Sequence, residues 1–214
     1  LGGGRSFGFR FQRSPGSTTR ANVSAEDPYI LGLPMRLAVR FDGFQQDSTF
    51  DNRSYAIEGG YRFQKLELST GASRELTRPG SAQSSMVPKS DSWFAGVGFS
   101  YLSLDNPMIP RKGIEVRSNV ENGRKERDVE RAAAGGGTER VLETAYQQRL
   151  QALVRLYMPV MQRHMAVVGV ETRAIQSRTY DDADLIRFGG ANSMRGYNEE
   201  QFRGRLEPIT FSAL

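Results

Sequence analysis

The chain of 214 residues contains no cysteine and a single histidine, His164. Without cysteine there can be no disulfide framework and no thiolate metal site, and one histidine cannot build an imidazole metal centre by itself. A nucleophile elbow is also missing, and the glycine run at 135–137 lacks the lysine and the strand-to-helix context of a phosphate-binding loop. These absences predict that the protein is not an enzyme and uses no metal or cofactor.

Long apolar runs are missing as well. No stretch of about 18 apolar residues occurs, which excludes helical membrane spans. The chain opens on Leu-Gly-Gly-Gly rather than on a basic segment followed by an apolar core, so no signal peptide is visible. The sequence is therefore either cytoplasmic or a part of a longer precursor. No basic block is interleaved with aromatic residues, so nucleic acid is not expected as a partner.

Glycine, phenylalanine and tyrosine are abundant, at 23, 12 and 8 residues, although hydrophobic residues make up only 38% of the chain. Apolar residues alternate with polar or small ones; Phe7, Phe9 and Phe11, for example, are separated by single such residues. A period of two is typical of β-strands. The pattern predicts about ten strands and almost no helix, with the strands at residues 5–12, 19–26, 35–44, 55–63, 66–75, 93–104, 114–121, 148–160, 165–176 and 206–214.

The predicted links between these strands alternate in length. Short or compact links are expected at 31–34, 64–65, 105–113 and 161–164. Long polar loops are expected at 45–53, 76–92, 122–143 and 177–204, with one helical turn possible at 127–134. In an up-and-down arrangement, all the short links lie at one end of the sheet and all the long ones at the other.

Two all-β architectures fit such strands. A soluble barrel or sandwich turns its apolar face inward, whereas an outer-membrane barrel turns it toward lipid and encloses a polar lumen. Aromatic residues near strand ends, among them Tyr55, Trp93 and Tyr101, resemble interfacial girdles, and charges of both signs share the other face with glycine. The sequence therefore predicts an all-β fold, a transmembrane antiparallel up-and-down β-barrel, with the soluble barrel as the alternative.

One loop near the end of the chain has an unusual composition. The segment Phe188-Gly-Gly-Ala-Asn-Ser-Met-Arg-Gly-Tyr197 combines a glycine pair and a third glycine with an arginine, whose rigid fork of donors needs an anionic or carbonyl partner. Such a loop is suited to fold back onto the protein, and a flexible surface loop is the alternative. Its candidate functional residues are Gly189, Gly190, Met194, Arg195, Gly196 and Tyr197.

A second motif and this loop together resemble a known family. The segment 101–113 resembles the strand-turn motif of the bacterial surface-antigen barrels, the superfamily of BamA and TamA, and carries Asp105, Asn106, Pro107, Pro110 and Gly113. The segment 188–197 resembles the sixth extracellular loop of that family, with Met194 in place of the usual valine. The segment 26–32 resembles an early strand end. The likeness spans essentially the whole chain.

The resemblance implies a sixteen-stranded barrel, of which residues 1–214 would form about strands three to twelve. The terminal strands and the periplasmic POTRA domains would lie outside this sequence. In the family, the loop arginine reaches into the lumen and pairs with acidic residues on later strands, so Arg195 is the matching residue. Glu171 is an acidic residue within this chain that could serve as a lumenal partner.

The resemblance further implies a function and its partners. Members fold and insert β-barrel proteins into the bacterial outer membrane, and the expected partners are nascent outer-membrane proteins, membrane lipids including lipopolysaccharide, and accessory lipoproteins of an assembly complex. The alternatives are a protein secretion translocator, a barrel anchor for a fused passenger, and a diffusion porin. Two of the motifs have purely structural alternatives: Arg195 could only hold its loop in place, and Asp105-Asn-Pro could be only a turn signal. The charged loop 122–143 is expected to be solvated, with binding of lipopolysaccharide or an accessory subunit as the alternative.

Overall fold

The computed structural model describes residues 4–14, 18–46, 50–80, 88–132, 138–161, 164–181, 184–189, 201–206 and 210–213. Ten of the described strands form one antiparallel sheet. Strands β1 to β9 lie in it in chain order, each paired with its sequence neighbours, and β12 pairs with β9. These strands are β1 (Ser6–Ser14), β2 (Thr18–Asp27), β3 (Met35–Gln46), β4 (Phe50–Phe63), β5 (Leu66–Pro79), β6 (Ser90–Leu104), β7 (Gly113–Ala132), β8 (Thr138–Met161), β9 (His164–Ser177) and β12 (Thr210–Ala213).

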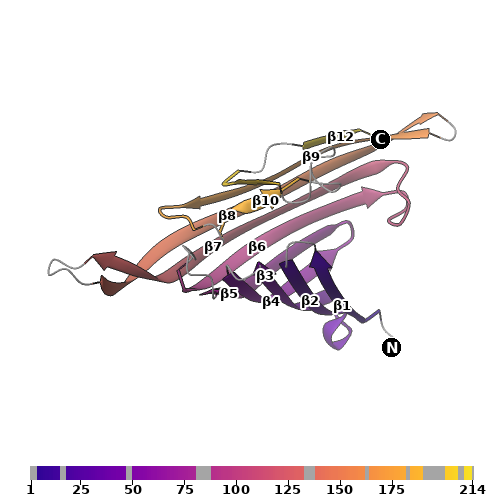
Figure 1. Cartoon of the computed structure of the whole chain (residues 1–214). Coiled ribbons are helices and arrows are strands. Elements are labelled where there is room, and N and C mark those ends of the chain that lie inside the picture. The colour runs from indigo at the N-terminus through magenta and orange to yellow at the C-terminus, as the bar shows by residue number, and fades with distance from the viewer. Residues whose placement is uncertain are drawn as a thin grey trace.

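Three short elements complete the described fold: a 3-10 turn, η1 (Ile30–Gly32), and two strands, β10 (Ile186–Phe188) and β11 (Phe202–Gly204), that pair with each other. The sheet is strongly curved, with long, tilted strands (Figure 1). In the described part of the chain β1 and β12 are its two edges and are not hydrogen-bonded to one another. The all-β, up-and-down antiparallel prediction is confirmed, and the described sheet is open. None of the described residues forms a helix long and apolar enough to cross a membrane.

Contacts between distant strands identify the inner face of the curved sheet. Arg36 of β3 bonds Glu67 of β5 over the strand between them, and Arg149 of β8 reaches Glu75 of β5 over two strands. Side chains can meet in this way only on the concave side. Since neighbouring residues of a strand point to opposite faces, the alternating apolar residues lie on the convex side.

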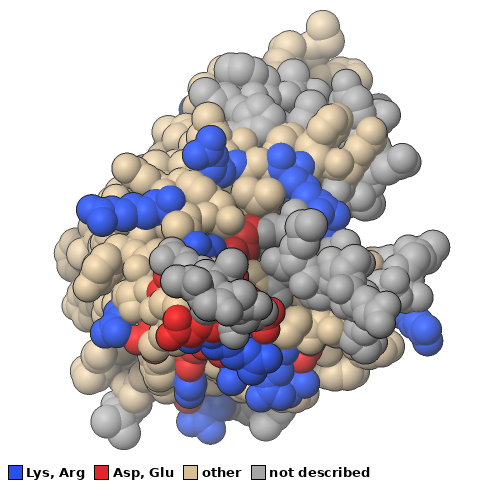
Figure 2. Space-filling view, turned by 60° about the vertical axis from the view of Figure 1, so that its left-hand side comes forward, with Lys and Arg blue, Asp and Glu red and all other residues tan. Residues whose placement is uncertain are grey.

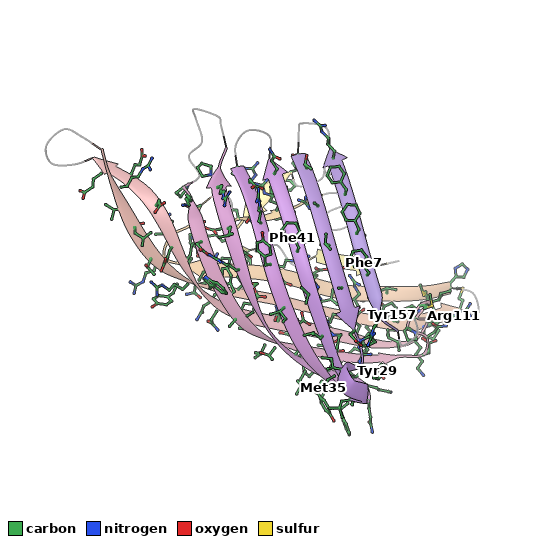
Figure 3. All side chains as sticks on the ribbon, turned by 90° about the horizontal axis from the view of Figure 1, so that it is seen from below. Phe7, Tyr29, Met35, Phe41, Arg111 and Tyr157 are labelled. Atoms are coloured by element: carbon green, nitrogen blue, oxygen red, sulfur yellow. The ribbon has the colours of Figure 1, made fainter. Side chains whose placement is uncertain are left out.

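The convex face is apolar and exposed. Phe7, Phe9 and Phe11 are 70%, 68% and 61% exposed, and Val97 is 63% exposed. Figure 3 shows the side chain of Phe7 on β1, the strand at one edge of the curved sheet. Exposed large apolar side chains recur on β1 and on β3 to β9, whereas soluble monomers rarely expose contiguous apolar patches larger than a few hundred Å2. The apolar residues therefore do not form an interior core, as they would in a soluble barrel, and the face is suited to lipid.

The length of the apolar band fits a bilayer. On β6 the outward residues from Trp93 to Tyr101 are apolar at every second position. Eight steps of about 3.4 Å give about 27 Å along the strand, or about 21 Å across the membrane at a tilt of about 40°. This value approaches the band of about 25 Å that outer-membrane barrels show.

Several segments predicted as loops are strands. Residues 122–132 and 138–143 belong to the long β7–β8 hairpin, so the loop and the helical turn predicted there are wrong for the described residues. Most of 45–53 likewise belongs to β3 and β4, and β5 and β6 extend into 76–92. Beyond the apolar band most residues on both faces of a strand are polar, so the period of two disappears from the sequence although the ladder continues. The difference in link length between the two ends is accordingly smaller than predicted.

Gly113 at the start of β7 is required by the backbone. Its φ is +138°, and a Cβ there would lie 2.0 Å from the carbonyl oxygen of Ser103. We expect Gly113→Ala to destabilise the protein by about 2–4 kcal/mol, because both the backbone strain and the overlap must be relieved. Gly59 is the matched control, since a Cβ added to it would meet no atom within 4 Å. Denaturant unfolding followed by tryptophan fluorescence measures both alanine variants, and equal midpoints would contradict the prediction.

Candidate functional site

The loop between β9 and β12 folds back on itself. Its two described limbs pair as β10 and β11, with Ile186 opposite Gly204 and Phe188 opposite Phe202. The rings of Phe188 and Phe202 stack at a centroid distance of 5.5 Å. Gly189, directly after β10, is buried and has a φ of +123°, which favours glycine. The limbs thus form a ribbon that leads into and out of residues 190–200.

Buried ion pairs tie the first limb to β7. Lys125, whose side chain is only 3% exposed, places its Nζ 2.7 Å from Asp181 Oδ2 and 2.6 Å from Asp184 Oδ2. Arg127 donates from Nη1 to Asp181 Oδ1 at 2.8 Å and from Nη2 to Glu143 Oε2 of β8 at 2.6 Å. We name Lys125, Arg127, Asp181 and Asp184 the loop anchor. Two cations and two limb carboxylates thus neutralise one another in a site almost closed to solvent.

The opposite wall of the sheet holds the ribbon through aromatic rings. The guanidinium of Arg187 in β10 lies 5.3 Å from the ring centroid of Phe44 in β3 and 5.7 Å from that of Phe50 in β4. Such distances are typical of cation–π contacts. Because β5 and β6 lie between β4 and β7 in the sheet, the described limbs cross the concave side from one wall to the other.

The second limb is fastened to β9. The backbone N–H of Ile175 donates to the carbonyl oxygen of Arg205 at 2.8 Å, and the Arg205 guanidinium lies 4.9 Å from the ring centroid of Tyr180. The hydroxyl of Tyr180 in turn accepts from the backbone N–H of Ser177 at 2.7 Å. The second limb is therefore attached along the edge of β9, where Leu206 also forms an antiparallel bridge with Ala174.

Ion pairs cover the rest of the concave face. Arg36 bonds Glu58 and Glu67, and Arg62 bonds Glu67 at 2.6 Å. Glu115, with a side chain 6% exposed, pairs with Arg117 at 2.7 Å. These groups lie in and around a polar cavity of about 660 Å3. Figure 2 shows acidic and basic side chains lying next to one another on one face of the molecule.

The strand-turn motif is closed by its own side chains. Asp105 Oδ1 accepts backbone N–H groups of Asn106, Arg111 and Lys112 at 2.9, 2.9 and 3.1 Å. Asn106 Oδ1 accepts those of Met108 and Ile109 at 2.9 and 3.3 Å. Pro107 and Pro110 have no N–H, which leaves fewer donors for the turn to satisfy. The bonds from Lys112 and Arg111 lower the pKa of the Asp105 carboxyl from its ordinary value.

Comparison with known proteins identifies the family. The family model of the Omp85 superfamily domain matches residues 1–210. The chain belongs to the Omp85 superfamily. No curated protein matches this Omp85 chain significantly. Superfamily members are outer-membrane proteins of bacteria and organelles that insert or translocate proteins, so the resemblance to BamA and TamA is confirmed at the level of the superfamily.

The structure places some of the predicted site residues in this Omp85 domain. Gly189 directly follows β10, Glu171 lies on the concave face, and the turn residues from Asp105 to Gly113 link β6 to β7. Glu171 is paired with Arg155 at 3.7 Å and with Arg173 at 3.1 Å. Gly190, Met194, Arg195, Gly196 and Tyr197 lie outside the described residues, so the pairing of Arg195 with a lumenal acid stays a prediction.

Sequence reasoning misses the loop anchor. Lys125 and Arg127 continue the inward alternation that includes Glu115, which is the signal that could identify them. Their segment has the composition of a loop because its outward positions, such as Arg124, are charged as well. Asp181 and Asp184 stand in a polar stretch without any period, and only the folded chain brings them to β7.

Breaking the loop anchor should destabilise the domain and release the loop. We expect Lys125→Met to cost about 3–5 kcal/mol, because it leaves Asp181 and Asp184 buried without this cation. Arg140→Gln is the control: its pair with Glu130 is exposed at 81% and 61%, and such pairs contribute less than about 1 kcal/mol. Denaturant midpoints and protease cleavage within 190–200 measure both effects. Similar results for the two variants would refute the anchor.

The Asp105 turn should show a defined pH dependence. Because the folded pKa of Asp105 is lowered, its contribution to stability is present above the ordinary aspartate pKa of about 3.9 and is lost as the pH falls through the lower folded pKa. We expect Asp105→Asn to lower the unfolding midpoint at neutral pH and the difference from the parent to shrink below about pH 3.9. A difference that does not change with pH would count against a role for the carboxylate charge.

Proposed function

We propose that this Omp85 domain is the membrane part of an assembly factor that folds β-barrel proteins and inserts them into the bacterial outer membrane. The observation that supports the proposal is the loop ribbon, whose limbs cross the concave side between β7 and β3–β4. A ribbon fixed to both walls obstructs straight passage through the interior. A diffusion porin would need that passage.

With its interior crossed, the domain would act on substrates at its boundary with lipid. A strand edge presents unpaired N–H and C=O groups, which in lipid cost several kcal/mol each unless they are paired. A nascent strand can satisfy such groups by adding to the edge. We propose that this step takes place at a seam between the first and last strands of the barrel, together with local weakening of the bilayer.

The proposed partners follow from this role. They are nascent outer-membrane proteins, accessory lipoproteins of an assembly complex, and membrane lipids including lipopolysaccharide. The β7–β8 hairpin is the proposed contact for lipopolysaccharide or a subunit, because it extends beyond Trp93 at the end of the apolar band. It exposes Tyr146 at 73% opposite Arg124 and Leu142 at 62% opposite Asp128.

A secretion translocator is the second candidate, and the charged cavity favours it. The cavity of about 660 Å3 is lined by charges that an extended polypeptide could pass, provided that the loop ribbon is released from its anchor. An assembly factor needs the ribbon to stay in place, whereas a translocator needs it to move. A barrel anchor for a fused passenger would require neither a fixed ribbon nor a movable one.

Substitution of Arg195 in the complete protein tests the proposal. We expect Arg195→Ala to misplace the loop and to reduce the yield of other folded barrels severalfold, and Arg195→Lys to restore it only in part, because lysine lacks the planar fork. Protease protection of the loop and the amounts of folded substrate barrels are the measurements. Secretion of a passenger that falls while barrel yields stay normal would instead favour the translocator.

A further inference from the structure

Two neighbouring turns at the short-link end carry exposed cations. The β4–β5 turn contains Lys65 and the β6–β7 turn contains Arg111 and Lys112, and all three residues are exposed. The turns adjoin each other, since Leu102 N–H donates to the Lys65 carbonyl oxygen at 2.9 Å and Lys65 Nζ donates to Ser103 Oγ at 2.9 Å. Arg111 lies at the same end of the molecule as Met35 and Tyr29 (Figure 3).

These cations have no carboxylate partner among the described residues. The nearby Asp105 directs Oδ1 at three backbone N–H groups of its own turn. Glu67 is engaged on the concave side by Arg36 and Arg62. Three positive charges therefore remain for an external anion. We name Lys65, Arg111 and Lys112 the basic rim.

The depth of the basic rim matches the phosphate level of a bilayer. Phe63, 59% exposed, is the last outward residue of β4, and Ile114 is the first outward apolar residue of β7. Lys112 stands two residues beyond Ile114, about 7 Å along the strand or about 5 Å across the membrane at a tilt of about 40°. Lys65 directly precedes Leu66, the partner of Phe63, but its Nζ reaches Ser103, which lies two residues beyond Tyr101 in the same row. The headgroup region extends about 5–8 Å beyond the hydrocarbon core on each side.

Two aliphatic side chains accompany the cations. Met108 is 91% exposed and Ile109 is 66% exposed, and the bonds to Asn106 hold both in a compact turn. Apolar groups beside lysine and arginine are the composition of segments that lie in a membrane interface. A turn that faced only water would gain nothing from exposing them.

We propose that the basic rim binds the phosphate groups of anionic phospholipids in the leaflet on the short-link side. The bound headgroups would fix the depth of β4 to β7 in that leaflet. This inference rests on the membrane location of the Omp85 domain and does not depend on whether the protein assembles or translocates substrates.

The test measures lipid affinity of the complete protein in detergent. Phosphatidylglycerol and phosphatidylcholine of equal chain length are titrated, and bound lipid is counted by native mass spectrometry. We expect the parent to prefer phosphatidylglycerol, and each of Lys65→Gln, Arg111→Gln and Lys112→Gln to weaken that lipid about fivefold without affecting phosphatidylcholine. Arg111→Gln and Lys112→Gln leave the turn intact, because only backbone groups of these residues bond Asp105. Lys65→Gln loses one exposed side-chain bond, to Ser103 Oγ, and keeps the backbone bond between Leu102 and residue 65.

A matched triple variant controls for total charge. The variant that combines Arg13→Gln, Arg78→Gln and Lys89→Gln removes three exposed cations at the opposite end of the sheet and should leave the preference for phosphatidylglycerol intact. It is compared with the basic-rim triple variant, which combines Lys65→Gln, Arg111→Gln and Lys112→Gln. Equal losses in both triple variants, or a parent without headgroup preference, would overturn the proposal. So would competition by inorganic phosphate at equal affinity, which would indicate a site for free anions, or a basic-rim triple variant that keeps lipid but loses an accessory subunit.

Discussion

The pairing of charges across the concave face is the interaction on which the rest of this structure depends. A strand that exposes apolar residues to lipid must turn every second side chain inward, and here arginine and glutamate recur at those positions among glycine, serine and amide residues. Unpaired, they would each carry a large desolvation cost. Contacts such as Arg36–Glu67 and Arg149–Glu75 bridge strands that are not neighbours and so also favour the curvature of the sheet.

The same requirement shapes the loop between β9 and β12. Its aspartates enter the interior, where only cations can balance them, and β7 supplies Lys125 and Arg127. On the far wall, Arg187 has aromatic rings as partners. The loop is therefore part of the packing of the interior rather than an addition at the surface. It mechanically joins strands from both halves of the sheet.

Within the apolar band the sequence is informative, because lipid on one side and paired charges on the other impose a clean period of two. Strands β1 to β9, the short links at 64–65 and 105–113, and the loop motif with Gly189 can all be located from the sequence. Outside the band the period is lost. The hairpin extensions of β7 and β8 and the anchor residue Asp181 escape prediction for that reason, since water accepts polar residues on both faces.

The sequence by itself determined the all-β class, the alternation of faces and the family motifs, because these depend on residues that are neighbours along the chain. Only the tertiary structure decided which face is concave, how far the strands extend, and which charges meet. Lys125 and Asp184 are 59 positions apart. No local pattern specifies such a pair; the curvature of the sheet and the return of the loop bring the two together.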